Sequence, residues 1–301
     1  RAGGVGRLHP GLPRRDRLPA IRAIPEALNP RQSHARIATR AMNVLEFLLK
    51  NYTNFNARVV KDATIAYWRH VASGGKVFWA VAGAMSSARL GITLAPAIRA
   101  GLIHGMSVTG ANLEESLFRL VAHRSYRDFP NYRYFTKQDD TRILDDGMRR
   151  VTDTSIPEDE AFRAVENILV PMWKEATKGG SRKFWHEYFY NLVLTLGEDL
   201  YEGDPEECWL LAAAKARLPL VVPGYEDSTF GNIFASHVKL GECDASIARS
   251  GIESMVDFYD RYRELSAGQG VGFFQIGGGS PGTSPSASSP RSSTTWNNPY
   301  D

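Results

Sequence analysis

Residues 76–87 read KVFWAVAGAMSS, a short apolar run followed by a loop that contains a glycine and two serines, and this segment is the clearest indication of the fold class. A run of about six residues that stops at a turn predicts a strand buried on both faces. Three further apolar runs, at 104–109, 218–222 and 271–276, also end in glycine-rich or polar loops. Helical patterns separate the four runs. The sequence therefore predicts an α/β fold, a parallel sheet with helices on both faces.

A helical insert separates the second run from the third. Ser155 to Glu158 (SIPE) has the pattern of a capping box with proline in the first turn. Behind it, apolar side chains recur at three- and four-residue spacing from Phe162 to Trp173, which predicts a buried helix face rather than a cofactor site. Pro171 is expected to kink this helix near its end.

The first 41 residues differ from this body. They hold nine arginines, no lysine and two acids, a net charge of +7, and show no sustained hydrophobic period. Such a segment buries too little apolar surface to offset its ordering entropy. It is arginine-rich and acid-poor, as organelle transit peptides are, but it is poor in serine. The alternative is that it is not translated, and the helical pattern that begins at Met42 favours Met42 as the start.

Residues 280–301 change character again and are dominated by serine, proline and threonine. One interpretation is a low-complexity, disordered tail. The other is a reading-frame error, because back-translation with a one-nucleotide shift turns SPGTSPSASSP into IAGDFPICVVP, which is apolar and strand-like. We expect the frame error, and with it a fold truncated at its C-terminus, poorly soluble and inactive. The expected organisation is a leader over 1–41, a folded domain over 42–279 and a tail over 280–301.

Charge and composition exclude several classes of function. Outside the arginine-rich leader the chain carries a net charge of −4, so the sequence pI of 8.8 gives no reason to expect nucleic-acid binding. No apolar run reaches the length of about 18 residues that a membrane span needs. Cys208 and Cys243 lie far apart without a CxxC spacing, which predicts a reduced, cytoplasmic protein. The histidines show no HExxH spacing, so no metal site is expected.

Four loops follow the predicted strands, and they are the candidate site. In a parallel sheet the carboxyl ends of the strands share one edge, where ligands bind. The loops are glycine-rich or polar: residues 82–87, 109–115, 224–229 and 277–279. Backbone N–H groups at helix starts bind phosphates, and glycine lets the backbone come close, so the set suits a nucleotide. Each loop alone is a weak signal, and no GxGxxG follows the first run.

Three acids in these loops allow two interpretations each. Glu114 and Glu115 could simply favour the positive end of the helix they open, or they could bind cationic amines or ribose hydroxyls. Asp227 could bind an adenosine ribose or hydrogen-bond its own turn.

Four motifs in order carry a resemblance to a known family. Together with weaker similarity from about residue 45 to 279, they resemble the deoxyhypusine synthase family in its bacterial branch. The motifs are GGKVFWAVAGAMSSARLG (74–91), VTGANLEESLFRLVAH (108–123), VVPGYEDSTFGNIFASH (221–237) and GFFQIGGG (272–279). The resemblance implies a Rossmann-like, NAD-binding domain that assembles as a tetramer, with NAD sites at dimer interfaces.

The same resemblance assigns roles to residues of the loops. Asp227 matches the acid that holds the NAD ribose, and Gly278 matches a glycine of close approach. The full set that it implies for NAD is Gly83, Ala84, Met85, Ser86, Ser87, Thr109, Gly110, Ala111, Glu115, Asp227 and Gly278. For the polyamine it implies Glu114, Glu115 and Asn232, and carboxylates suit this task because buried ammonium groups need opposite charge.

Two departures from the family pattern bear on activity. Asn232 stands where hypusine-forming members have an aspartate, which removes one negative charge from the amine site. The Trp-Gly-Lys motif, whose lysine captures the aminobutyl group as an imine, does not occur, and no lysine follows Lys239. No catalytic nucleophile is therefore expected within this sequence.

The function implied is an aminobutyl transfer. In this family NAD takes a hydride from spermidine, and the aminobutyl group passes to a lysine of the translation initiation factor that carries hypusine. Two alternatives stay open: a homospermidine synthase, with putrescine as the acceptor, or a non-catalytic family remnant that binds NAD.

Overall fold

The computed structural model describes residues 43–279, 281 and 282. The expectations for residues 1–41 and for the tail from 283 onward lie outside the described residues. The chain divides into two compact units, residues 1–63 and 64–301. The first unit contains α2 (Val44–Asn51), where Asn43 and Glu46 form a capping box, and the start of α3 (Phe55–Ala72). The helix predicted after Met42 is confirmed.

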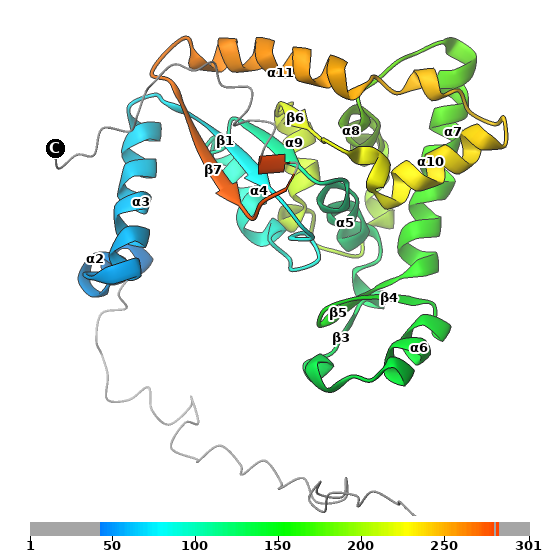
Figure 1. The fold of residues 1–301 in the computed structure, drawn as a ribbon, viewed down its shortest axis with the longest axis horizontal. Helices are drawn as coiled ribbons and strands as arrows, with labels where there is room; N and C mark the ends of the chain where they lie inside the picture. The colour runs from blue at the N-terminus through cyan, green and yellow to red at the C-terminus, as the bar shows by residue number, and fades with distance from the viewer. Residues whose placement is uncertain (1–42, 280, 283–301) are drawn as a thin grey trace, which may run out of the picture. The chain divides into compact units, whose positions relative to one another are not determined.

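A four-stranded parallel sheet is the centre of the second unit (Figure 1). The strand order is β6-β2-β1-β7, and every pair of neighbours is parallel. The strands are β1 (Lys76–Val81), β2 (Gly105–Val108), β6 (Leu220–Val221) and β7 (Val271–Ile276). All four predicted strands and the predicted fold class are confirmed.

Helices cover both faces of this sheet. On one face, α11 (Gly251–Ser266) buries Phe258 against Phe78 of β1, with the ring centroids 4.9 Å apart. The opposite face carries the main core, where Val81 and Met106 pack among buried side chains of the other helices. These helices are α4 (Gly91–Arg99), α5 (Gly110–Val121), α7 (Ala164–Gly179), α8 (Trp185–Thr195), α9 (Trp209–Ala216) and α10 (Thr229–Lys239).

Short 3₁₀ turns connect these elements. They lie at His123–Ser125, Tyr132–Tyr134, Glu198–Leu200, Pro205–Glu207, Tyr225–Asp227 and Ala245–Ile247. The turn at 225–227 belongs to one of the predicted site loops.

The insert between β2 and β6 contains a small antiparallel sheet that the sequence did not predict. Its order is β3-β5-β4, and α6 (Lys137–Asp145) precedes β4. The strands are β3 (Arg127–Asp128), β4 (Met148–Val151) and β5 (Thr154–Pro157).

The predicted capping box at Ser155 to Glu158 is wrong. These residues belong mostly to β5, which is buried along its whole length and pairs with β4, so that Ser155 lies opposite Arg150. Pairing with distant segments outweighs the local capping pattern here. A π-helical turn, Glu158–Arg163, leads into α7, which continues past Pro171 and ends before Gly180 at φ 63°. The predicted buried stripe of this helix is confirmed.

Replacing Phe258 by alanine tests the packing of α11 on the sheet. The side chain is 2% exposed, so Phe258→Ala leaves a cavity beside Phe78 and should lower the free energy of unfolding by about 3–5 kcal/mol. Val256→Ala on the same helix is the matched control, because that side chain is 55% exposed, and it should cost less than about 0.5 kcal/mol. Urea unfolding measures both. Equal losses of unfolding free energy in the two variants would contradict the packing of Phe258 against Phe78.

Candidate functional site

The strand order places a topological switch point at β1. The chain passes from β1 to β2 and β6 on one side, and then returns to lay β7 on the other side of β1. Loops that leave two such strands run in opposite directions, and open α/β sheets bind ligands between them, at the carboxyl ends of the strands. Residues 82–87 follow β1 and residues 277–279 follow β7, so both loops flank the switch point.

The loop after β1 is exposed at Gly83 and buried at Ser86 and Ser87. Gly83 has φ 64°, which favours glycine, and no atom lies within 4 Å of the position that a Cβ would take. Ala84 and Met85 are half-buried. Ser86 and Ser87 are each 4% exposed, and both hydroxyls bond within the chain, Ser86 Oγ to Asn112 O at 2.7 Å and Ser87 Oγ to Glu115.

The loop after β2 leads directly into α5. Thr109 is the N-cap, and its hydroxyl accepts a hydrogen bond from Asn112 N at 3.2 Å and donates one to Gly83 O at 2.7 Å. Within the described part of the chain, no acceptor faces the N–H groups of Gly110 and Ala111. Gly110 is buried and Ala111 is half-buried, and unpaired N–H donors at a helix start are the type of group that binds an anion.

Glu114 and Glu115 do not lie in the first turn of α5, which begins at Gly110. The interpretation that they favour the start of their own helix is therefore wrong. Glu114 instead accepts a hydrogen bond from Phe230 N at 2.9 Å and so caps α10. Both side chains are buried, 1% and 6% exposed.

Burial controls the ionisation of this acid pair. The pKa of Glu114 is raised to about 7 mainly by burial, which outweighs the hydrogen bonds from Ser228 and Phe230 that lower it, with a smaller raising contribution from the charge of Glu115. Burial also raises the pKa of Glu115, against the hydrogen bonds from Ser87 and the charge of Arg119. The two acids are thus buried together, and Glu114 is partly protonated near neutral pH.

The loop after β6 presents Asp227 to solvent. Its N–H donates to Gly224 O at 3.1 Å, but its carboxylate has no hydrogen-bond partner among the residues that the structure describes. The interpretation that this side chain bonds its own turn therefore finds no support. Asn232 is also exposed, and its amide Nδ2 donates to Ser228 O at 2.8 Å. The Asn232 side chain is thus directed toward the loop.

The loop after β7 contacts the loop after β1. A Cβ at Gly277 would lie 3.0 Å from Ala82 Cβ, and Ala82 N donates to Ile276 O at 2.9 Å. At Gly278 the position of a Cβ is open, with no atom within 4 Å. The predicted residues of all four loops therefore lie at one edge of the sheet.

Two residues of this region were not predicted from the sequence. Asn112 is 1% exposed and hydrogen-bonds to Gly83 and Ser86 of the loop after β1. Tyr225 is also 1% exposed, stacks on Trp185 with ring centroids 4.1 Å apart, and has a hydroxyl without a hydrogen-bond partner among the described residues. Burial, and then the charge of Glu114, raise the pKa of Tyr225 well above its usual value. An aromatic ring inside a polar loop was the only sequence signal for Tyr225.

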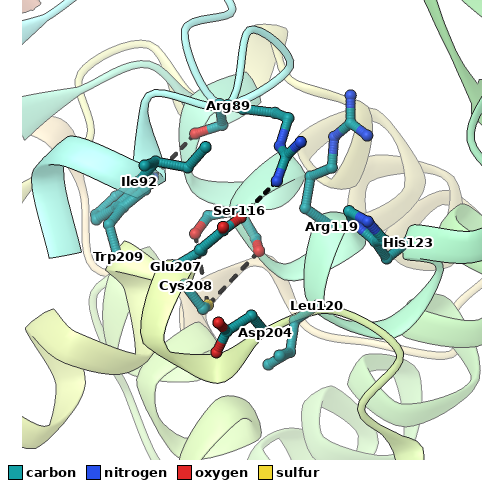
Figure 2. A pocket seen from close by; sticks show the side chains of 12 residues that line it. Arg89, Ile92, Ser116, Arg119, Leu120, His123, Asp204, Glu207, Cys208 and Trp209 are labelled. Atoms are coloured by element: carbon teal, nitrogen blue, oxygen red, sulfur yellow. Dashed lines mark hydrogen bonds and ion pairs between the residues drawn. The ribbon is translucent and has the colours of Figure 1, made fainter. Parts of the chain in front are cut away.

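A small pocket lies behind the loop after β1 (Figure 2). Arg89 forms an ion pair with Glu207 at 2.7 Å, and Ser116 contacts the buried Cys208 at 3.6 Å. Trp209 Nε1 donates to Ser86 Oγ at 2.9 Å. The bond from Trp209 alone of these contacts reaches the loop, and it joins the start of α9 to the back of the loop.

The described residues contain no group of three or more His, Cys, Asp or Glu side chains that could hold a metal ion. In the same part of the chain, no helix combines the length and the hydropathy that crossing a bilayer requires.

Comparison with known protein families identifies the chain. The family model described as deoxyhypusine synthase matches residues 48–283, most of the sequence. The chain belongs to the deoxyhypusine synthase family. This agrees with the four motifs and with the loops that they form at the switch point.

Individual members of the family are distant. "Probable deoxyhypusine synthase 2" of Methanosarcina acetivorans is 25% identical over 181 residues, which are 60% of this chain and 49% of that protein. The chain thus spans about half the length of the curated relative it matches. A crystal structure from Entamoeba histolytica, also named as a deoxyhypusine synthase, has a TM-score of 0.48 and 10% identity, and covers 79% of this chain and 77% of that one.

The raised pKa of Glu114 predicts that the free energy of unfolding decreases as pH rises. Its pKa of about 7 in the folded chain exceeds the ordinary value of 4.5, so the folded state keeps the proton longer than the unfolded state does. The stabilisation is fully present below about pH 4.5 and is lost as pH rises through 7. Glu114→Gln keeps an oxygen for Phe230 N but cannot ionise. The free energy of unfolding of Glu114→Gln, taken relative to wild type, should therefore increase by on the order of 2 kcal/mol from pH 5 to pH 8.

Urea unfolding of both proteins at the two pH values measures this difference. Glu115 is present in both proteins, so its titration largely cancels. A difference between variant and wild type that does not change with pH would show that Glu114 stays ionised in the folded chain.

Proposed function

We propose that this chain carries the cofactor- and amine-binding half of an NAD-dependent aminobutyl transferase of the deoxyhypusine synthase type. The observation that carries the proposal is the meeting of chain-distant loops at one switch point, with open glycines, free helix N–H groups and a buried pair of acids. The family match over residues 48–283 supports it.

The residues present fit a dinucleotide. The free N–H groups of Gly110 and Ala111 would bind phosphate oxygens, and the open space at Gly83 and Gly278 would admit the dinucleotide close to the backbone. Asp227 would hold a ribose through its carboxylate. When bound, NAD supplies the hydride acceptor for the oxidation of spermidine.

The remaining predicted residues would support or extend this site. Thr109, Ser86 and Ser87 would hold the two loops in place, while Ala84, Met85 and Glu115 would border the cofactor. Glu114 and Glu115 would supply negative charge for the polyamine, and Asn232 would lie at its edge.

The proposed acceptor is a lysine of the translation initiation factor that carries hypusine. The comparisons name deoxyhypusine synthase and give no reason to favour putrescine as the acceptor or a non-catalytic remnant. The sequence has no Trp-Gly-Lys motif, so the described residues account for binding rather than for capture of the aminobutyl group. We further propose a cytoplasmic homotetramer.

Calorimetry with NAD, followed by an assay of spermidine-dependent NADH formation, tests the proposal. NAD binding with spermidine-dependent NADH is expected if the site is competent for hydride transfer. NAD binding without NADH would limit the chain to cofactor binding, and no NAD binding would refute the proposal.

Asp227→Ala should weaken NAD binding and spare the fold. Loss of a charge-assisted hydrogen bond to a ribose costs about 1.5–3 kcal/mol, which is roughly a 10- to 150-fold rise in Kd. Glu226→Ala is the matched control, because this neighbouring acid is also exposed in the same turn. Titration calorimetry should show near wild-type affinity for the control. An unchanged Kd for Asp227→Ala would remove Asp227 from the site.

Asn232→Asp should tighten the binding of spermidine to the NAD-saturated protein. A carboxylate in place of the amide is repelled by Ser228 O, and its charge attracts an ammonium group, which is worth about 1 kcal/mol or about fivefold in Kd. Asn191→Asp, an exposed site on α8, adds the same charge elsewhere and controls for net charge. Equal effects of both substitutions would show that position 232 does not face the amine.

A further inference from the structure

Asn112 is the most heavily hydrogen-bonded side chain of the site region, and the resemblance gave it no role. It lies in the first turn of α5, 1% exposed, between the loop after β1 and the loop after β2. Its Nδ2 lies 3.2 Å from Val81 O, 3.2 Å from Ala82 O and 2.9 Å from Gly83 O. Nδ2 also lies 2.9 Å from Thr109 Oγ1.

The carboxamide oxygen binds the far end of the same loop. Asn112 Oδ1 accepts a hydrogen bond from Ser86 N at 2.9 Å, and Asn112 O accepts one from Ser86 Oγ at 2.7 Å. Asn112 thus contacts the loop at two points, Gly83 and Ser86, on either side of the half-buried Ala84 and Met85. The residues between these two points, Ala84 and Met85, have no such support from the side chain of Asn112.

The chemistry of this position requires a carboxamide. Its surroundings present several carbonyl oxygens on one side and an N–H donor on the other, so the side chain must offer donors and an acceptor together. An ionised aspartate has the same shape but no donor, and an alanine leaves buried carbonyl groups without a partner. Because the site is buried, neither loss is compensated by water.

We propose that Asn112 is a positioning residue that holds residues 82–87 in the pose required for the dinucleotide, and so determines cofactor affinity through contacts with the loop alone. The role of the loop in binding NAD rests on the proposed function. The attachment of the loop to Asn112 rests only on the hydrogen bonds of Asn112.

The experiment compares Asn112→Ala and Asn112→Asp with wild type in the full chain. Ser116→Ala is the matched control, because Ser116 is also buried on α5, and its hydroxyl accepts from Leu210 N at 3.2 Å, away from the loop. Amide hydrogen exchange of peptides covering residues 82–90 is measured without nucleotide. NAD affinity is measured by calorimetry from pH 5.5 to pH 8.

Both Asn112 variants should raise exchange in the loop and weaken NAD binding at pH 8 by about tenfold or more. As pH falls, the introduced carboxyl group of Asn112→Asp gains a proton. It then offers an O–H donor and keeps an acceptor for Ser86 N, so this variant should recover affinity relative to wild type. Asn112→Ala should show no recovery, and Ser116→Ala should leave both readouts near wild type. A general loss of stability would not restore NAD affinity at low pH in Asn112→Asp while leaving Asn112→Ala unchanged.

Other titratable groups near the loop are the same in every variant. They are Glu114, Glu115 and Arg119 of α5, Arg89 after the loop, Tyr225 of the loop after β6 and Cys208 beside α9. Affinities are therefore compared with wild type at the same pH, which removes their common contribution.

The outcomes separate this inference from the proposed function. If wild type does not bind NAD, the proposed function fails, and hydrogen exchange alone decides whether Asn112 holds the loop. If wild type binds NAD, unchanged affinity in Asn112→Ala overturns the inference. Loop exchange that is unchanged in both Asn112 variants also overturns it.

Discussion

The structure depends on the placement of β1 between two parallel neighbours. Trp79 of β1 lies opposite Met106 of β2 on one side and Phe274 of β7 on the other. Because all these pairs are parallel, the loops that follow the strands meet at one edge of the sheet. The reversal of strand order at β1 then creates the switch point, so the site follows from strand order before any site side chain is considered.

Polar groups, rather than apolar packing, hold the loops at this edge. Asn112 connects two loops, Thr109 bonds back to Gly83, and Glu114 caps α10 from within α5. Such bonds give a loop a defined shape while leaving its outer surface open for a ligand. The cost is the burial of acids, which makes the stability of this region sensitive to pH, since desolvation favours the neutral form of Glu114.

Along β7, side chains on both faces of the sheet remain partly exposed. Phe78 is buried against α11, whereas Phe273, which lies opposite it in β7, and the adjacent Phe274 remain 42% and 40% exposed. Tyr67 packs edge-on against Phe274, with ring centroids 6.0 Å apart. Among the described residues, β7 therefore presents apolar side chains at the surface.

The four parallel strands, the loops at their ends and the buried stripe of α7 could be predicted from the sequence, because they depend on local hydrophobic patterns and on turn residues. Other features depend on contacts between distant segments of the chain. Ser155 became part of a strand instead of a cap, because its partners in β4 and β3 compete with the local pattern. Glu114 caps a helix more than a hundred residues away, and Asn112 clamps two loops, because the sheet brings together backbone groups that no local spacing connects.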